Sequence, residues 1–191
     1  MKDLLPETIT SDVAPSSQLD VVIDGRHLPF AKASLRAIGM TNVLHHIPNV
    51  QLFFNEAGRC VRPGGVIAMI EPWVTGWSRL VYGCLHHEVM DPHSSEWTFE
   101  AEGRMSDSNM ALPWIIFERD RRRFEEEFPQ WRIEITEPFM PLRYLLSGGV
   151  SMRTVVPVWS YGLWRALERR AGNWITSAGM FAKIRLTRTD A

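Results

Sequence analysis

The sequence predicts an α/β protein built on a doubly wound, mostly parallel sheet of about six strands. Its most regular stretch is an apolar strand at 37–43, a helix at 49–61 and a second apolar strand at 66–70. Two strands joined through a helix form a right-handed crossover, which is the repeating unit of such sheets. The chain has 191 residues, 45% of them hydrophobic and 23% charged, enough for a sizeable core. We therefore expect a single domain over residues 1–191.

Each predicted element has a local reason. Asn49 suits the N-cap of a helix, and apolar residues follow it at helical spacing. The helix is expected to end at Arg62-Pro63-Gly64-Gly65, because proline and glycine interrupt helices. The same criteria predict strands at 8–13, 19–23, 131–136 and 180–186, and helices at 118–128 and 164–170.

Helix 118–128 is expected to present a solvated, internally paired face, because its acids and bases are spaced four residues apart. The expected pairs are Glu118 with Arg122, Arg121 with Glu125 and Arg123 with Glu127.

Two segments interrupt the alternation of strands and helices, at 72–115 and at 142–174. Both are rich in aromatic residues and too long for simple connections, so we expect packed insertions or lids. The stretch 155–170 is amphipathic, and packing against the domain is the favoured interpretation over contact with a membrane surface.

Composition excludes several classes of protein. The 21 basic and 22 acidic residues give a formal charge of −1, so no global field attracts nucleic acid. Cys60 and Cys84 are too few for a disulfide framework or a cysteine-based zinc site. No apolar run approaches the ~20 residues that span a bilayer, and the N-terminus does not open as a signal peptide. We expect a soluble, cytoplasmic protein without a transmembrane segment.

Four motifs follow one another between residues 12 and 71. They are Asp24-Gly25-Arg26-His27-Leu28-Pro29-Phe30, Ser34-Leu35-Arg36-Ala37-Ile38, Asn42-Val43-Leu44-His45-His46-Ile47-Pro48 and Glu56-Ala57-Gly58-Arg59-Cys60-Val61-Arg62-Pro63-Gly64-Gly65. Their order and spacing resemble the class I S-adenosylmethionine-dependent methyltransferases, in particular the small-molecule "type 11" group. The resemblance implies a Rossmann-like fold and methyl transfer from S-adenosylmethionine to a small acceptor, for which aromatic-rich insertions would form an apolar roof.

The resemblance also implies roles for five residues. Asp24 would accept a hydrogen bond from the adenine amine, with the backbone of Gly25 nearby. Asp12 would hold the ribose hydroxyls, because one carboxylate offers acceptors to two vicinal hydroxyl groups. Thr41 and Asn42 would line the methionine part of the cofactor. All five follow strands, and open α/β sheets bind ligands at the carboxyl ends of their strands.

One departure from the family pattern is the lack of a glycine-rich turn of the form Gly-x-Gly-x-Gly. The first glycine is Gly25, so the first strand and helix of the family are expected to be missing, as in a truncated copy. That absence would leave unpaired strand edges in the sheet. A second hypothesis follows: a non-catalytic remnant that acts as a homo-oligomerising or partner-binding module.

His46 is the candidate catalytic base, since a histidine titrates near physiological pH. The alternative is a histidine at a helix entry, held by a backbone hydrogen bond. Methyl transfer from a sulfonium also proceeds by proximity alone.

No metal site is predicted. Neighbouring residues are expected to point in different directions, which argues against a joint site at His45 and His46. The series His86, His87, Glu88, Asp91 and His93 matches no standard ligand spacing. Glu71 ends a strand, where it either faces the substrate or caps the next turn.

Overall fold

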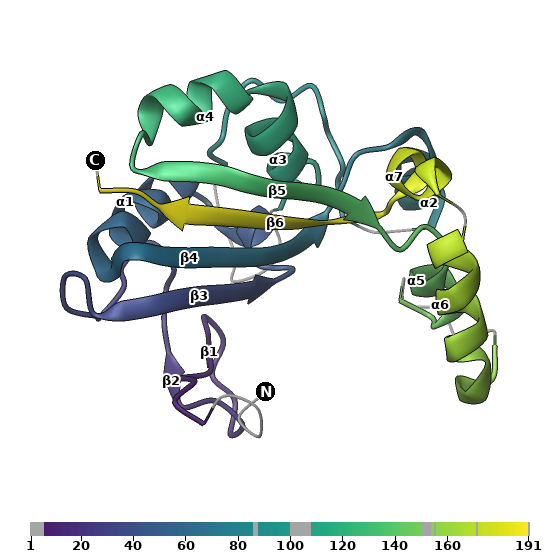
Figure 1. The fold of residues 1–191 in the computed structure, drawn as a ribbon, viewed down its shortest axis with the longest axis horizontal. Coiled ribbons are helices and arrows are strands. Elements are labelled where there is room, and N and C mark those ends of the chain that lie inside the picture. Colours follow the sequence, from purple (N-terminus) through teal and green to yellow (C-terminus); the bar gives the residue numbers. More distant parts are fainter. Residues whose placement is uncertain are drawn as a thin grey trace.

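The computed structural model describes residues 6–85, 88–99, 108–149, 154, 156–170 and 172–190. Its main sheet has four strands, β3 (Leu35–Thr41), β4 (Val61–Pro72), β5 (Trp131–Phe139) and β6 (Phe181–Arg188), in the order β3-β4-β6-β5 (Figure 1). β3 and β4 are parallel, whereas β6 runs antiparallel to both of its neighbours. The sheet is therefore mixed rather than mostly parallel.

The predicted crossover is confirmed. Helix α1 (Val50–Cys60) connects β3 to β4, and the side chain of Asn49 accepts a hydrogen bond from the Leu52 amide at 3.1 Å, as expected of an N-cap. The Pro-Gly-Gly segment ends α1 but lies inside β4, where Gly64 has a φ of 72°. A side chain on Gly65 would lie 2.5 Å from Val61 Cγ1 and 2.8 Å from the Arg36 carbonyl oxygen, so the approach to β3 requires glycine.

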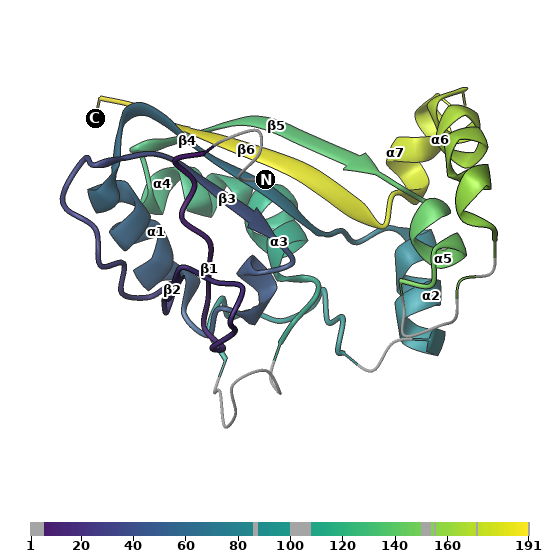
Figure 2. The same cartoon turned by 90° about the horizontal axis from the view of Figure 1, so that it is seen from below.

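The two N-terminal strands do not join the main sheet. β1 (Ser11–Asp12) and β2 (Val21–Val22) pair with each other in parallel and form a separate two-stranded sheet (Figure 2). The expectation of a single six-stranded sheet is therefore wrong, because β1 and β2 pair with each other and neither is paired with β3. The expectation of a buried strand at 37–43 is also wrong. β3 lies at the edge of the main sheet, and Met40 is its only buried residue.

The helices packed along the main sheet lie on one face (Figure 2). Side chains alternate accordingly in β4 and β6: Ile67, Met69 and Ile184 are buried, whereas Ala68 and Lys183 are exposed. Such alternation is typical of a sheet with one packed and one solvated face. Among the described residues, the second helical layer of a doubly wound sheet is therefore not found.

The core between sheet and helices is aromatic. α3 (Leu112–Trp114), a π-helical turn (Ile115–Arg119) and α4 (Arg121–Glu127) bring Phe117 and Phe124 against Phe54 of α1. The ring centroids lie 6.1 Å and 5.0 Å from that of Phe54, with edge-to-face geometry that favours aromatic pairs.

Helix α4 is shorter than the predicted helix 118–128. The pairs of Arg121 with Glu125 and of Arg123 with Glu127 form as predicted. Arg122 instead bonds Glu126, because Glu118 belongs to the preceding π-helical turn.

The two predicted insertions meet beyond the end toward which β3 and β4 point (Figure 1). The first contributes α2 (Gly76–Leu85), and the second contributes α5 (Arg143–Leu146), a 3-10 turn (Val158–Ser160), α6 (Tyr161–Arg170) and α7 (Asn173–Ala178). Tyr82 of α2 lies 6.4 Å from Tyr144 of α5 between ring centroids. None of the helices in the described ranges is both long and apolar enough to cross a membrane.

Candidate functional site

The candidate site surrounds the turn that follows β3. Asn42 adopts a left-handed backbone conformation with a φ of 53°, and its amide donates to the Ile70 carbonyl of β4 at 2.9 Å. A 3-10 turn (Leu44–His46) follows and leads into α1. The chain therefore reverses sharply at the carboxyl edge of the sheet, where open α/β sheets bind ligands.

Glu71, at the end of β4, fixes this turn. Its carboxylate is fully buried, and Oε1 accepts hydrogen bonds from the amides of Val43 and Leu44, both at 2.9 Å. Its Oε2 lies 2.7 Å from His45 Nδ1. Glu71 therefore caps the turn after β3, whereas the sequence analysis considered a cap of the turn that follows Glu71 itself.

The turn also brings the two histidines together. The ring centroids of His45 and His46 lie 4.1 Å apart, which overturns the expectation that the adjacent side chains diverge. Glu88 Oε2 lies 3.7 Å from His45 Nε2 and 3.9 Å from His46 Nε2. His45 is buried, whereas the side chain of His46 is 21% exposed.

These surroundings separate the two imidazoles electrostatically. Burial, the largest effect, opposes a charge on His45, but the carboxylates of Glu71 and Glu88 outweigh it and raise the pKa of His45 above its ordinary 6.5. Burial and the neighbouring His45 lower the pKa of His46 below 6.5, despite the opposing carboxylates. The two pKa values are therefore shifted in opposite directions, so His45 binds a proton more readily than His46.

Two of the predicted cofactor residues converge on this turn. Asp12, at the end of β1, is close enough for its charge to raise the pKa of His46, and its Oδ1 accepts from the Ala14 amide at 2.9 Å. A side chain on Gly25 would lie 3.1 Å from Ile47 Cδ1, so the backbone there approaches the turn closely. Asp12 is exposed to solvent, as are Thr41 and Asn42.

Asp24 is engaged by its neighbour. The Arg26 guanidinium contacts both carboxylate oxygens, with Nη2 to Oδ2 at 2.7 Å, and the Arg26 amide donates to Oδ1 at 2.9 Å. These bonds lower the pKa of Asp24. The structure therefore shows Asp24 as one partner of an ion pair.

Sequence reasoning missed the clamp that positions this segment. The Arg59 guanidinium of α1 donates to the carbonyls of Leu28 and Phe30, at 2.8 and 2.7 Å. Glu56 accepts from the Leu28 amide at 3.0 Å and from Arg59. The sequence did indicate this clamp, because Glu56 and Arg59 lie three positions apart in the fourth motif.

Asp91 and His93, which the sequence analysis considered as metal ligands, are not part of this site in the described chain. Asp91 accepts from the amide of His93 at 2.9 Å within a local turn. His86 and His87 lie outside the described residues.

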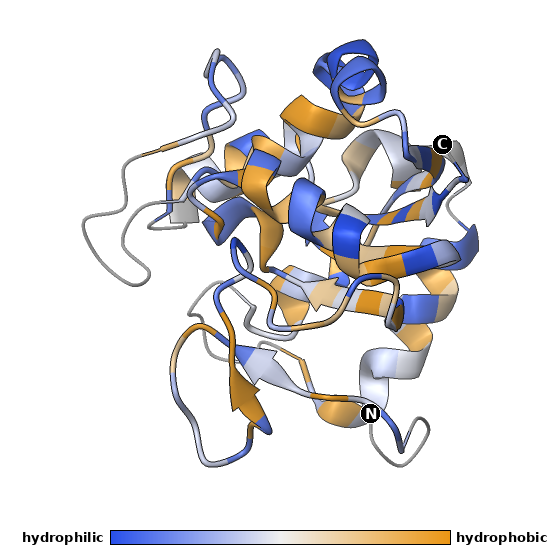
Figure 3. Cartoon of the chain, turned by 90° about the vertical axis from the view of Figure 1, so that its left-hand side faces the viewer, coloured by the Kyte–Doolittle hydropathy of each residue, from blue (hydrophilic) through white to orange (hydrophobic). Residues whose placement is uncertain are grey.

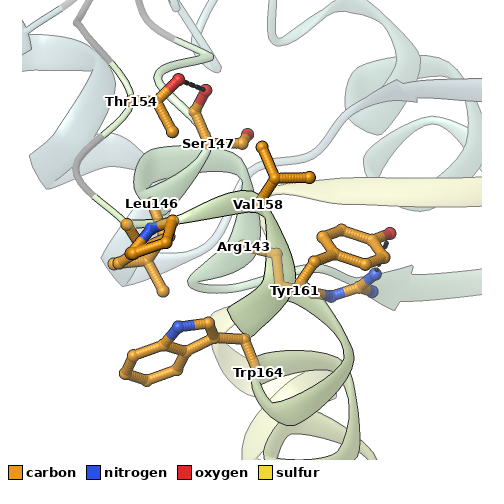
Figure 4. A pocket seen from close by; sticks show the side chains of 9 residues that line it. Arg143, Leu146, Ser147, Thr154, Val158, Tyr161 and Trp164 are labelled. Carbon is orange, nitrogen blue, oxygen red and sulfur yellow. Dashed lines mark hydrogen bonds between the residues drawn. The ribbon is translucent and has the colours of Figure 1, made fainter.

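A cavity of about 200 Å³ lies between α5 and α6, apart from the turn after β3 (Figure 4). Leu146, Val158, Tyr161 and Trp164 line it, and Arg143 at its side is neutralised by buried Glu168 and bonded to Tyr161 Oη at 2.8 Å. The cavity is thus largely apolar.

Residues 3–69 match the family model described as a methyltransferase domain. None of the curated proteins matches the sequence.

Among solved structures, a presumed methyltransferase from Bacillus halodurans C-125 superposes with a TM-score of 0.51 at 13% identity, covering 100% of this chain and 86% of that one. The complex of the Haloferax volcanii Trm112 methyltransferase activator with a presumed methyltransferase gives a TM-score of 0.49 at 13% identity, covering 90% of this chain and 61% of that one. Geranyl diphosphate C-methyltransferase from Streptomyces coelicolor A3(2) gives 0.48 at 11% identity, covering 88% and 52%.

The chain thus spans only about half to three fifths of the length of the latter two proteins. The likeness to the Bacillus protein concerns the fold alone, while the sequence match covers the segment that carries the four motifs. Residues 3–69 are thus similar to the methyltransferase domain family, and the fold of the chain is similar to that of the Bacillus protein.

Proposed function

We propose that this chain binds S-adenosylmethionine and transfers its methyl group to a small, apolar acceptor. The observation that carries the proposal is the convergence of Asp12 and Gly25 on the turn after β3, beside Thr41 and Asn42. The segments of the family motif thus meet at one edge of the sheet, although β1 and β2 are not paired with β3.

The residues present suit the cofactor. The exposed carboxylate of Asp12 offers acceptor oxygens for two ribose hydroxyls. The close backbone at Gly25 suits the adenine, and Thr41 and Asn42 suit the methionine moiety. Asp24 must exchange its bidentate bond to Arg26 before it accepts from an adenine amine. S-adenosylmethionine, when bound, supplies a methyl group already activated on a sulfonium.

His46 is the base in this proposal. Its lowered pKa favours the neutral imidazole, and the ring is partly open to solvent, so it can accept a proton from an acceptor hydroxyl or amine as the methyl group arrives. His45 suits this role less well, because it is buried and bonded to Glu71.

The insertions support an apolar acceptor. They contribute the aromatic pair of Tyr82 and Tyr144 and the apolar cavity of Figure 4, beyond the end toward which β3 and β4 point.

The proposal is tested by cofactor binding followed by methyl transfer. Equilibrium binding of S-adenosylmethionine should weaken about tenfold or more in Asp12→Asn, which removes a charged acceptor at nearly constant shape. Asp20→Asn is the matched control, since Asp20 is exposed and bonds Thr10 within the β1–β2 unit. Label from methyl-labelled cofactor should then reach small apolar hydroxyl compounds in wild type and far less in His46→Ala. Equal cofactor affinity in Asp12→Asn and wild type would refute the assignment.

A second candidate, an oligomerising or partner-binding module, is favoured by the open edge of β3 and by the apolar strand β2 (Figure 3). Val21 and Val22 of β2 are 37% and 52% exposed. Unpaired edges and exposed apolar strands favour pairing with another chain. Light scattering separates the two: a monomer that binds cofactor supports the enzyme, and an obligate dimer without cofactor affinity supports the module.

A further inference from the structure

We propose that His45, His46 and Glu88 form a binding site for a divalent transition-metal ion, with Zn²⁺ as the best match to the ligand set. Each residue contributes one ligand atom, and these three atoms all lie within 4.8 Å of one another. The ligands come from two distant parts of the chain, the turn after β3 and the segment after α2.

The spacing is close to what an ion requires. A tetrahedral zinc ion bound at about 2.0–2.2 Å holds its ligands roughly 3.4 Å apart. Glu88 Oε2 is 3.7 Å from His45 Nε2 and 3.9 Å from His46 Nε2. A contraction of a few tenths of an ångström would bring both of these contacts to the ligand spacing of a zinc site.

The same distances are too long for hydrogen bonds, whose usual range ends near 3.2 Å. Glu88 Oε2 also accepts a hydrogen bond from Ser108 Oγ at 3.2 Å, a bond that fixes the carboxylate beside the two imidazoles. His46 Nδ1 is also buried and has no hydrogen-bond partner within the described residues.

Glu71 supplies an independent observation. Histidines that ligate metals almost always donate their other ring N–H to a carboxylate or carbonyl, which fixes the tautomer and makes the ligand nitrogen more basic. Glu71 Oε2 lies 2.7 Å from His45 Nδ1, and the amides of Val43 and Leu44 hold its other oxygen. This arrangement leaves His45 Nε2, which faces Glu88, as the coordinating atom.

Two histidines and one carboxylate suit zinc, and three protein ligands leave a fourth position for water or a substrate oxygen. One consequence of metal binding rests on the proposed function, in which His46 is the base. An ion on His46 Nε2 would occupy the lone pair that the base needs, so metal binding and proton acceptance by His46 exclude each other. Metal loading would then inhibit methyl transfer.

The test is a titration of the chelator-treated full-length chain with Co²⁺, without S-adenosylmethionine. The expected result is saturable binding of one ion with the visible absorption bands of low-coordinate Co²⁺, and its displacement by Zn²⁺. His46→Ala and Glu88→Gln should each abolish these bands or weaken binding at least tenfold. Glu71→Gln should weaken binding by roughly 10–100-fold, as is typical of groups that orient a ligand.

His93→Ala and Glu96→Gln are the matched controls, because both side chains are exposed near Glu88 in sequence and neither belongs to the cluster. Circular dichroism of each variant separates loss of the site from loss of the fold, and Glu88→Gln is the least disruptive change. A featureless titration of wild type would overturn the proposal, and so would full binding by Glu88→Gln. A double variant of His86 and His87 that alone loses binding would place the site elsewhere and overturn it as well. Since no cofactor is present, the outcome is independent of whether the chain transfers methyl groups.

Discussion

Glu71 is the residue whose removal tests the account of the turn most sharply. In Glu71→Ala, the buried amide of Leu44 loses its acceptor, and an unsatisfied buried donor costs about 1–3 kcal/mol. The bond between the carboxylate and His45 is charge-assisted and is worth about 1.5–3 kcal/mol. The amide of Val43 lies in an exposed residue and can turn to water at little cost.

We therefore expect Glu71→Ala to lower the free energy of unfolding by about 3–5 kcal/mol, in line with the loss of one partner from a buried pair. Glu71→Gln keeps an oxygen for the two amides and loses only the proper acceptor for His45, so its loss should be smaller, about 1–3 kcal/mol.

Urea denaturation followed by circular dichroism measures both values, and the unfolding slope checks that the transition stays two-state. Glu137→Ala is the control, because Glu137 is 56% exposed in its ion pair with Lys183 and should change stability by less than about 1 kcal/mol. A loss below about 1 kcal/mol in Glu71→Ala would refute the view that this carboxylate holds the turn.

Three further predictions concern pH and the backbone. Hydrogen bonds from Arg59 lower the pKa of Glu56 from 4.5 to about 2, so its contribution to stability is complete above pH 4.5 and lost as the pH falls through about 2. The difference in urea midpoint between wild type and Glu56→Gln should therefore shrink between pH 5 and pH 2, and a constant difference would contradict this. Gly65→Ala should cost about 1–3 kcal/mol by overpacking, whereas Gly39→Ala, with no atom within 4 Å of the added carbon, should be nearly neutral in the same melting experiment. In NMR titrations, His45 should titrate above pH 6.5 and His46 below it, so His45 stabilises the fold below pH 6.5 and loses that contribution as pH rises through its folded pKa. Indistinguishable titration midpoints would contradict the assignment.

Local patterns predicted the elements well. Residue periodicity and capping chemistry predicted the N-cap at Asn49 and the crossover through α1. They also predicted strands that the structure confirms as β4, β5 and β6. These features depend on neighbours in the sequence, which a single chain displays directly.

The arrangement of strands could not be predicted in the same way. The division into sheets of two and four strands depends on which edges pair, and pairing is a contact between residues far apart in the sequence. The charged residues Lys183 and Arg185 of β6 indicated that one face of the sheet is solvated. The expectation of a doubly wound sheet, which is covered on both faces, did not take them into account.

The site was predicted in part. The residues of the motif meet at the turn after β3, but the contact of Glu88 with His45 and His46 arises from the fold of the first insertion and has no fixed spacing. The pairing of Asp24 with Arg26 was visible in principle, since the two are separated by one residue, yet only the geometry shows that both oxygens are held.

The most direct test of the central claim is a calorimetric titration of the purified chain with S-adenosylhomocysteine, which has the shape of the cofactor without its methyl group. The account predicts saturable binding at one site, weakened about tenfold in Asp12→Asn and unchanged in Asp20→Asn. Flat heats from a chain that circular dichroism shows to be folded would contradict it, because the methyltransferase fold would then be present without a cofactor site.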